Sequence, residues 1–267
     1  MNETIEQINS AEANLDKESA SEERGVPLSD FVNDKKNEVD EGTFKFLEFM
    51  LKQNPLIGKI EVKFVLPEDE PCTGGFFTPV VADGKESVPV ISIVKRDLKH
   101  INNVIDIRKS SAKAVAQLLE IDFSEMTPDL LRLFIIAHEL GHATDYIANY
   151  ESNPDYLGDG AEAVEEWKLH YDVNLLMMPV PGFDPVELRD EFTKYDNLDL
   201  FYEAHPEVKK YMNTDSIESF ADLMDAQENA YRNSEYERFA DGFATKFLKG
   251  NAKELNLSQL VKKSKAA

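Results

Sequence analysis

The pattern of apolar and polar positions predicts a first helix that begins shortly after residue 42. Apolar side chains recur there at the spacing of one helical face, and Asn54-Pro55 follows as a stop signal. The positions are Phe44, Phe46, Leu47, Met50 and Leu51. We therefore expect an amphipathic helix at the start of a folded unit.

Apolar residues at every second position, Ile60, Val62, Phe64 and Leu66, then predict a strand. Two further apolar runs, 76–81 and 88–94, flank the turn signal Asp83-Gly84 and predict a hairpin. Because proline cannot donate a backbone hydrogen bond, Pro79 and Pro89 are expected at edge or end positions. Strands followed by helices indicate an α+β fold.

A second helix is predicted from Thr127-Pro128-Asp129, where threonine can cap, proline suits the first helical position and aspartate suits the positive end of the helix dipole. The following residues, 130–136, are apolar almost all round the helix. This pattern is typical of a buried helix.

Charge divides the 267-residue chain, whose net charge is −22, into regions. Residues 1–41 carry 12 acidic and 4 basic side chains and are predicted to be a disordered acidic arm. Residues 42–250 are predicted to form a single domain with an acidic helical insertion at about 150–230, since 143–236 alone has 22 acidic and 6 basic residues. Residues 251–267 are interpreted as a basic tail with a frayed end.

Composition also excludes several kinds of function and site. The negative charge argues against binding to nucleic acid or to an anionic membrane, and no apolar run is long enough to cross a bilayer. The N-terminus lacks the features of a signal peptide, so a cytoplasmic protein is expected. Cys72 is the only cysteine, which excludes thiolate-rich metal sites. Nothing in the pattern points to an oligomeric state.

The candidate metal-binding and catalytic residues lie in the segment His138-Glu139-Leu140-Gly141-His142. Histidines four residues apart lie on one helical face, so both imidazoles can bind one Zn²⁺. Glu139 lies about 100° round the same turn, within reach of a water on the metal. This is the HExxH arrangement of zinc peptidases, and its neighbours are uncharged, as in a buried site.

A catalytic zinc needs a third protein ligand, and the sequence offers two candidates. The metzincin pattern is excluded because Asp145 and Ala148 replace its glycine and histidine. Glu218 and Glu237 remain open, since each is followed four residues later by an aspartate, Asp222 or Asp241, that could orient a histidine ligand. Glu237 is favoured because Phe239, Ala240, Phe243 and Ala244 continue an apolar face after it.

HELGH followed by ERFADGFATKFL resembles the gluzincin metallopeptidases, including the ImmA/IrrE type and the catalytic domain of anthrax lethal factor. The resemblance covers about residues 44–248. It implies a zincin-like fold, in which a short twisted, mainly antiparallel sheet packs on a zinc-binding helix and the C-terminal half is largely helical. It also implies that Glu237 is the third ligand. Tyr211 resembles the tyrosine that precedes the third ligand in lethal factor, which keeps Glu218 open.

The predicted function is zinc-dependent hydrolysis of peptide bonds by a metal-activated water, with Glu139 as general base and a peptide or protein as substrate. Candidates for stabilising the oxyanion are Tyr211, Tyr231, His170 and His205. Two alternatives stand beside this prediction. One is a regulatory or partner-binding zincin-fold protein with little or highly restricted proteolysis, and the other is a domain in which zinc is only structural.

Overall fold

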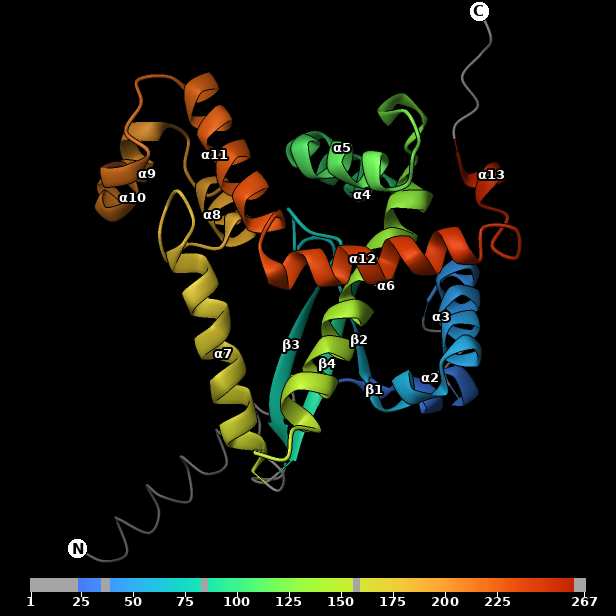
Figure 1. Ribbon diagram of the computed structural model, residues 1–267. Coiled ribbons are helices and arrows are strands. Elements are labelled where there is room, and N and C mark those ends of the chain that lie inside the picture. The colour runs from blue at the N-terminus through green and yellow to red at the C-terminus, as the bar shows by residue number, and fades with distance from the viewer. Residues whose placement is uncertain (1–23, 35–38, 83–85, 156–158, 262–267) are drawn as a thin grey trace, which may run out of the picture.

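The computed structural model describes residues 24–34, 39–82, 86–155 and 159–261 (Figure 1). None of its described helices is long and apolar enough to cross a membrane. The strands are β1 (Val26–Pro27), β2 (Glu61–Val65), β3 (Gly75–Ala82) and β4 (Glu86–Val94). The helices are α2 (Leu28–Asp34), α3 (Glu41–Gln53), α4 (Leu98–Ile107), α5 (Lys109–Leu118), α6 (Pro128–Tyr146), α7 (Gly160–Leu176), α8 (Pro185–Phe192), α9 (Leu198–Ala204), α10 (Pro206–Tyr211), α11 (Ile217–Arg232), α12 (Glu235–Gly250) and α13 (Leu257–Leu260), with short helical turns at Pro55–Lys59, Phe123–Glu125 and Ile147–Glu151.

The fold is α+β, with a small mixed sheet in the order β1-β2-β4-β3. The predicted hairpin is present as antiparallel β3 and β4, although its expected turn at Asp83-Gly84 lies outside the described residues. Strand β2 pairs with β4 in parallel, which the sequence had not indicated. Pro79 lies on the edge strand, and its partner Pro89 precedes the part of β4 that pairs with β2. Both prolines therefore avoid ladder positions between two strands.

Helix α6 is the centre of the molecule and crosses the sheet, with α12 packed against it (Figure 1). Thr127 caps α6 by accepting a hydrogen bond from the backbone N–H of Leu130 at 3.2 Å, and Pro128 is the first helical residue, as predicted. Thirteen of its nineteen residues are buried. The main hydrophobic core forms around it and includes Phe134 and Leu140 of α6 with Ile91 and Ile93 of β4.

A second, smaller core lies in the acidic region, where α8 to α11 pack on one another. Its buried members are Val180, Leu188, Leu198, Phe201, Tyr202, Val208, Met212, Phe220 and Met224. These helices stand apart from the sheet, and the C-terminal end of α11 leads into α12 (Figure 1). The charged outer surfaces of this region thus enclose an apolar centre of its own.

Two terminal predictions need correction. Part of the predicted disordered arm is folded, because β1 pairs with β2 and α2 buries Leu28 and Phe31 in the main core. Residues 1–23 and 35–38 of that arm lie outside the described residues. The predicted basic tail is folded as far as Val261, since the Thr127 hydroxyl donates a hydrogen bond to the Leu260 carbonyl at 2.6 Å. Apolar contacts outweigh the polar composition in both segments.

Candidate metal centre

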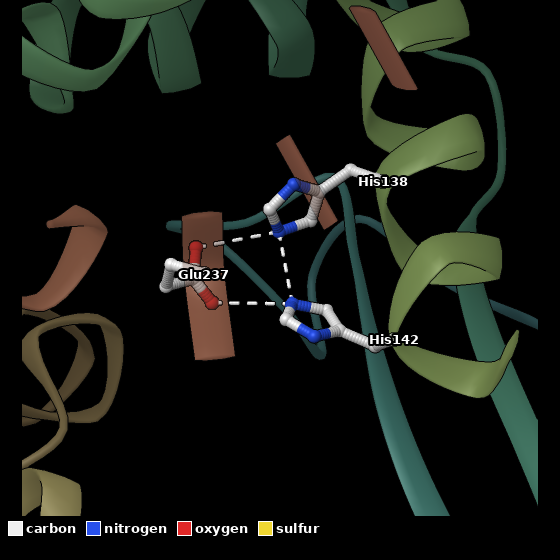
Figure 2. Close-up of side chains that lie close together, drawn as sticks. All are labelled: His138, His142 and Glu237. Carbon is white, nitrogen blue, oxygen red and sulfur yellow. Dashed lines mark hydrogen bonds and ion pairs between the residues drawn. The ribbon is translucent and has the colours of Figure 1, made fainter. Parts of the chain in front are cut away.

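The two histidines of α6 lie one turn apart on the same buried face, and their side chains converge. The Nε2 atoms of His138 and His142 are 3.0 Å apart (Figure 2). Only 8 % of His138 and 3 % of His142 are exposed. The helical period and the burial of α6 account for both observations.

Glu237 of α12 completes the group from the opposite side (Figure 2). Ser234 caps α12 by accepting a hydrogen bond from the Glu237 N–H, so the glutamate lies in the first helical turn. Its Oε2 is 3.3 Å from His138 Nε2, and its Oε1 is 3.2 Å from His142 Nε2. These three buried residues form a group that could hold a metal ion.

The close approach of α12 to α6 depends on Gly141, which lies between the two histidines. A Cβ at position 141 would lie 2.9 Å from the Cα of Ala240 and 3.1 Å from the Cβ of Phe243. Such distances are too short for any larger residue without separating the helices. The small residues at this crossing therefore bring the Glu237 carboxylate to the histidines.

The spacing of the three side chains fits a tetrahedral ion. For ligand bonds of about 2.05 Å, the edge of a tetrahedron is roughly 3.3 Å. The two Nε2 atoms are 3.0 Å apart, and each lies 3.2 or 3.3 Å from a different oxygen of the Glu237 carboxylate, so all three distances are close to that edge. Three donors can thus occupy three corners and leave the fourth for another ligand.

Asp241 contacts the ring nitrogen of His138 that does not face Glu237, as expected from its spacing to Glu237. Its Oδ1 is 2.9 Å from His138 Nδ1, which leaves Nε2 directed at Glu237. Arg232 Nη2 donates to both carboxylate oxygens of Asp241, at 2.6 and 2.7 Å. A carboxylate at Nδ1 orients the imidazole ring and strengthens it as a ligand.

The charges in the group are strongly coupled. Burial alone would raise the pKa of Glu237, but His138 and His142 hold that pKa well below its ordinary value. Burial opposes a charge on His138 as well, yet Glu237 and Asp241 raise the pKa of this imidazole. The position that favours a proton here also favours a cation, because both are attracted by the two carboxylates.

Glu139 lies beside this group on the wall of a large pocket. It is only 7 % exposed, and burial raises its pKa to about 7. His138 and nearby arginines oppose this rise, while the charge of Glu237 adds to it. A carboxyl group with a pKa near neutrality can both accept and return a proton.

The pocket has a volume of about 830 Å³ and is enclosed by β3, α5, α6, α7, α8 and the junction of α11 and α12. Strand β3 is an edge strand, and its residues from Gly75 to Thr78 line the pocket. Acidic side chains from two segments also line it: Glu68, Asp69, Glu70, Glu187 and Asp190. Burial and the charges of Asp190, Asp69 and Glu187 raise the pKa of Glu70 to about 7. Acidic side chains therefore outnumber the basic ones that also line the pocket, Arg108, Lys168, Lys194 and Arg232.

The structure separates the alternatives that the sequence left open. Glu218 and Asp222 are exposed on α11 and do not belong to the buried group. Tyr211 is exposed as well and does not line the pocket. Of the four oxyanion candidates, only Tyr231 lines it.

The two histidine candidates have other partners. The ring of His170 lies 2.7 Å from the Tyr150 hydroxyl, and that of His205 lies 3.2 Å from Glu191. Neither histidine lines the pocket. Their side chains are therefore engaged away from the metal group.

Two residues of the site were missed in the sequence. Tyr236 stacks on His142, with ring centroids 4.0 Å apart and an interplanar angle of 19°, and it lines the pocket. Its position next to Glu237 was the available signal. Arg232 precedes Glu237 by five residues, and no local pattern linked it to Asp241.

Comparisons of the chain with protein-family models, curated proteins and solved structures found no match. The geometry of the site therefore carries the functional argument alone.

Proposed function

We propose that the protein is a zinc-dependent peptidase of the gluzincin type. The observation that carries this proposal is the buried group of His138, His142 and Glu237 with Glu139 beside it on the pocket wall. The packing of α6 against a small sheet, with α12 supplying the third side chain, supports a zincin-like arrangement.

The donor set supports zinc as the metal. Two imidazole nitrogens and one carboxylate oxygen suit Zn²⁺, whereas Mg²⁺ and Ca²⁺ prefer oxygen ligands throughout. When bound, zinc would supply Lewis-acid chemistry, polarising a carbonyl group and lowering the pKa of a water. His138, His142 and Glu237 would hold it.

Glu139 is the proposed general base. Its carboxylate takes a proton from the attacking water and later gives it to the nitrogen of the leaving amine. Burial prepares the group for this role by raising its pKa to about 7. Tyr231 is the proposed donor to the developing oxyanion, because it lines the same pocket and burial keeps its hydroxyl neutral by raising its pKa.

The pocket walls favour a peptide as substrate. An edge strand has free backbone groups on one side, and an extended peptide can pair with them as an additional strand. β3 offers such an edge along the pocket that contains Glu139. A peptide bound there would run past the metal group.

The test compares wild type with Glu139→Gln on a digest of a complex proteome, scoring new termini. Both proteins should bind one zinc, and only wild type should produce new termini. Glu48→Gln, an exposed substitution on α3, serves as the control and should behave as wild type. If wild type and Glu139→Gln produce the same new termini in the same amounts, the proposed role of Glu139 is refuted.

The alternative functions lead to different results in the same experiment. Zinc binding with cleavage of one protein only would favour a regulatory protein with restricted proteolysis. Zinc binding with no cleavage at all would favour a structural or partner-binding role. The pocket and the buried Glu139 argue against a purely structural zinc, because such a site needs neither.

A further inference from the structure

The outer face of α7 carries an apolar stripe at helical spacing. Leu169, Val173, Leu176 and the C-cap residue Met177 are 54 %, 50 %, 60 % and 80 % exposed. Residues separated by four, seven and eight positions lie on one side of a helix. No described segment of the chain covers this stripe, so the apolar surface faces solvent.

The stripe is distinct from the side of α7 that stabilises the fold. Trp167 and Tyr171 lie on the inner side, pack on the main core and line the pocket. Single exposed apolar residues are ordinary on protein surfaces, but a contiguous stripe commonly marks a binding surface. The contacts that stabilise the fold therefore do not explain why the outer side of α7 is apolar.

The same side of the helix becomes acidic toward its N-terminus. Glu162, Glu165 and Glu166 precede Leu169 by seven, four and three residues, which places them in line with it. Glu162 and Glu165 are exposed, and Glu166 is half-buried. The surface thus has an apolar end and a negatively charged end.

Charge and position argue against a terminal segment or a second copy of this chain as the binding partner of this face of α7. Residues 1–23 contain seven acidic residues and one lysine, so they would be repelled by the acidic end. A second copy would bring another net charge of −22 to the same face. The lysines at 262–265 follow Val261 directly after α13, which lies on the far side of the molecule from α7 (Figure 1).

We propose that this face of α7 is a docking site for a cationic amphipathic helix of another protein. The partner helix would place apolar residues on Leu169, Val173, Leu176 and Met177, and lysines or arginines on the acidic end. From Glu162 to Met177 the face is roughly 23 Å long, or about four helical turns. The proposal does not depend on the metal centre or on peptidase activity.

The test uses the full chain and two synthetic peptides of the same composition, about 16 residues long. One peptide has leucines on a single helical face with lysines toward one end, and the other is a scrambled sequence without an apolar face. The amphipathic peptide should bind wild type at least about tenfold more tightly than the scrambled peptide, as measured by fluorescence anisotropy.

Variants assign the binding to α7. Changing Leu169, Val173, Leu176 and Met177 to serine should abolish the preference for the amphipathic peptide. A matched quadruple variant at other exposed apolar positions should retain it: Leu56, Leu66, Leu98 and Ile217. Neutralising the acidic end with glutamine at 162, 165 and 166 should weaken binding of the same peptide, and this loss should be smaller at high salt.

Three results would overturn the proposal. The first is equal binding of the two peptides by wild type. The second is a wild-type dimer that the serine variant converts to a monomer, which would make the occupant a second copy. The third is binding that appears only after removal of residues 1–23, which would make that arm the occupant.

Discussion

The pairs Glu218/Asp222 on α11 and Glu237/Asp241 on α12 have nearly the same local sequence and opposite surroundings. The first pair is exposed, and the second is buried against the histidines of α6. Each glutamate is followed by a phenylalanine and an alanine at the same spacing. The local pattern places each pair on one side of its helix, but it does not say which side faces the core.

The packing of the intervening residues accounts for the difference. On α11 the phenylalanine, Phe220, is buried in the second core and its neighbouring alanine is exposed. On α12 the alanine, Ala240, is buried against α6, and Phe239 is 45 % exposed. Adjacent residues differ by about 100° round a helix, so this exchange turns the acidic pair inward on α12.

The largest expected effect is on the third ligand. Glu237→Gln should weaken zinc binding by more than roughly 100-fold, since even partners outside the ligand set contribute 10- to 100-fold. The matched Glu218→Gln should bind zinc as wild type does. Titration against a competing chelator measures both affinities. If only the Glu218 substitution weakens binding, the comparison between the two helices is wrong.

The two aspartates should differ in their effect on zinc affinity in the same way as the two glutamates, but by less. Asp241→Asn should weaken zinc binding by about 10- to 100-fold, because it removes the carboxylate that orients His138. Asp222→Asn should change the affinity little, since its side chain is exposed. Equal affinities for the two variants would show that the contact with His138 does not support the metal group.

The helix crossing can be tested through two glycines. Gly141→Ala should destabilise the fold by about 1–3 kcal/mol, because its Cβ would meet the backbone of Ala240. Gly242→Ala on α12 meets nothing within 4 Å and should stabilise by about 0.5–1 kcal/mol. Urea unfolding of the two variants measures both changes. A stabilising Gly141→Ala would mean that the helices can separate without cost.

Helix α11 also has a buried acid, Glu228, which is neutralised by Arg108 and Arg189. Burial would raise its pKa, but the two arginines and the Ser111 hydroxyl hold that pKa below its ordinary value. Its contribution to stability is therefore present above pH 4.5 and is lost as the pH falls through its lowered pKa.

Ser111→Ala removes one of these hydrogen bonds and should cost about 1 kcal/mol at pH 7. The difference from wild type should shrink as the pH falls through the lowered pKa of Glu228, because the carboxyl group is then protonated. Ser110 donates instead to the half-exposed Asp225, so Ser110→Ala should cost less. Unfolding curves from pH 3 to 7 measure the trend, and a constant difference would contradict it.

The acidic segment between the two motifs and the acidic wall of the pocket should influence the choice of substrate. Peptides with lysine or arginine near the scissile bond should be cleaved faster than acidic peptides, by up to about tenfold, with the preference reduced at high salt. A peptide library assayed at two salt concentrations measures this. Equal rates at both concentrations would leave the acidic residues without a role in selecting substrate.

Local sequence patterns predicted the helices and strands that can be recognised from a short stretch of sequence alone. The cap at Thr127, the buried α6 and the β3–β4 pairing follow from residue types and spacing over short stretches. The folded part of the N-terminal segment was missed, because β1 has two residues and α2 seven, too few for a reliable period. Leu28 and Phe31 are ordered by contacts with distant residues of the core.

The sequence by itself determined that His138 and His142 share one helical face with Glu139 beside them, because the helical period relates residues within one turn. It also limited the third ligand to two glutamates. Only the tertiary structure decided between them, since Glu237 is separated from His142 by 94 residues of chain and reaches it through the contact of Gly141 with Ala240. The same holds for Arg232 and Tyr236, whose partners are set by the packing of α11 against α12 and of α12 against α6. Such contacts depend on which helical faces are apolar and small enough to meet, and no local spacing encodes that choice.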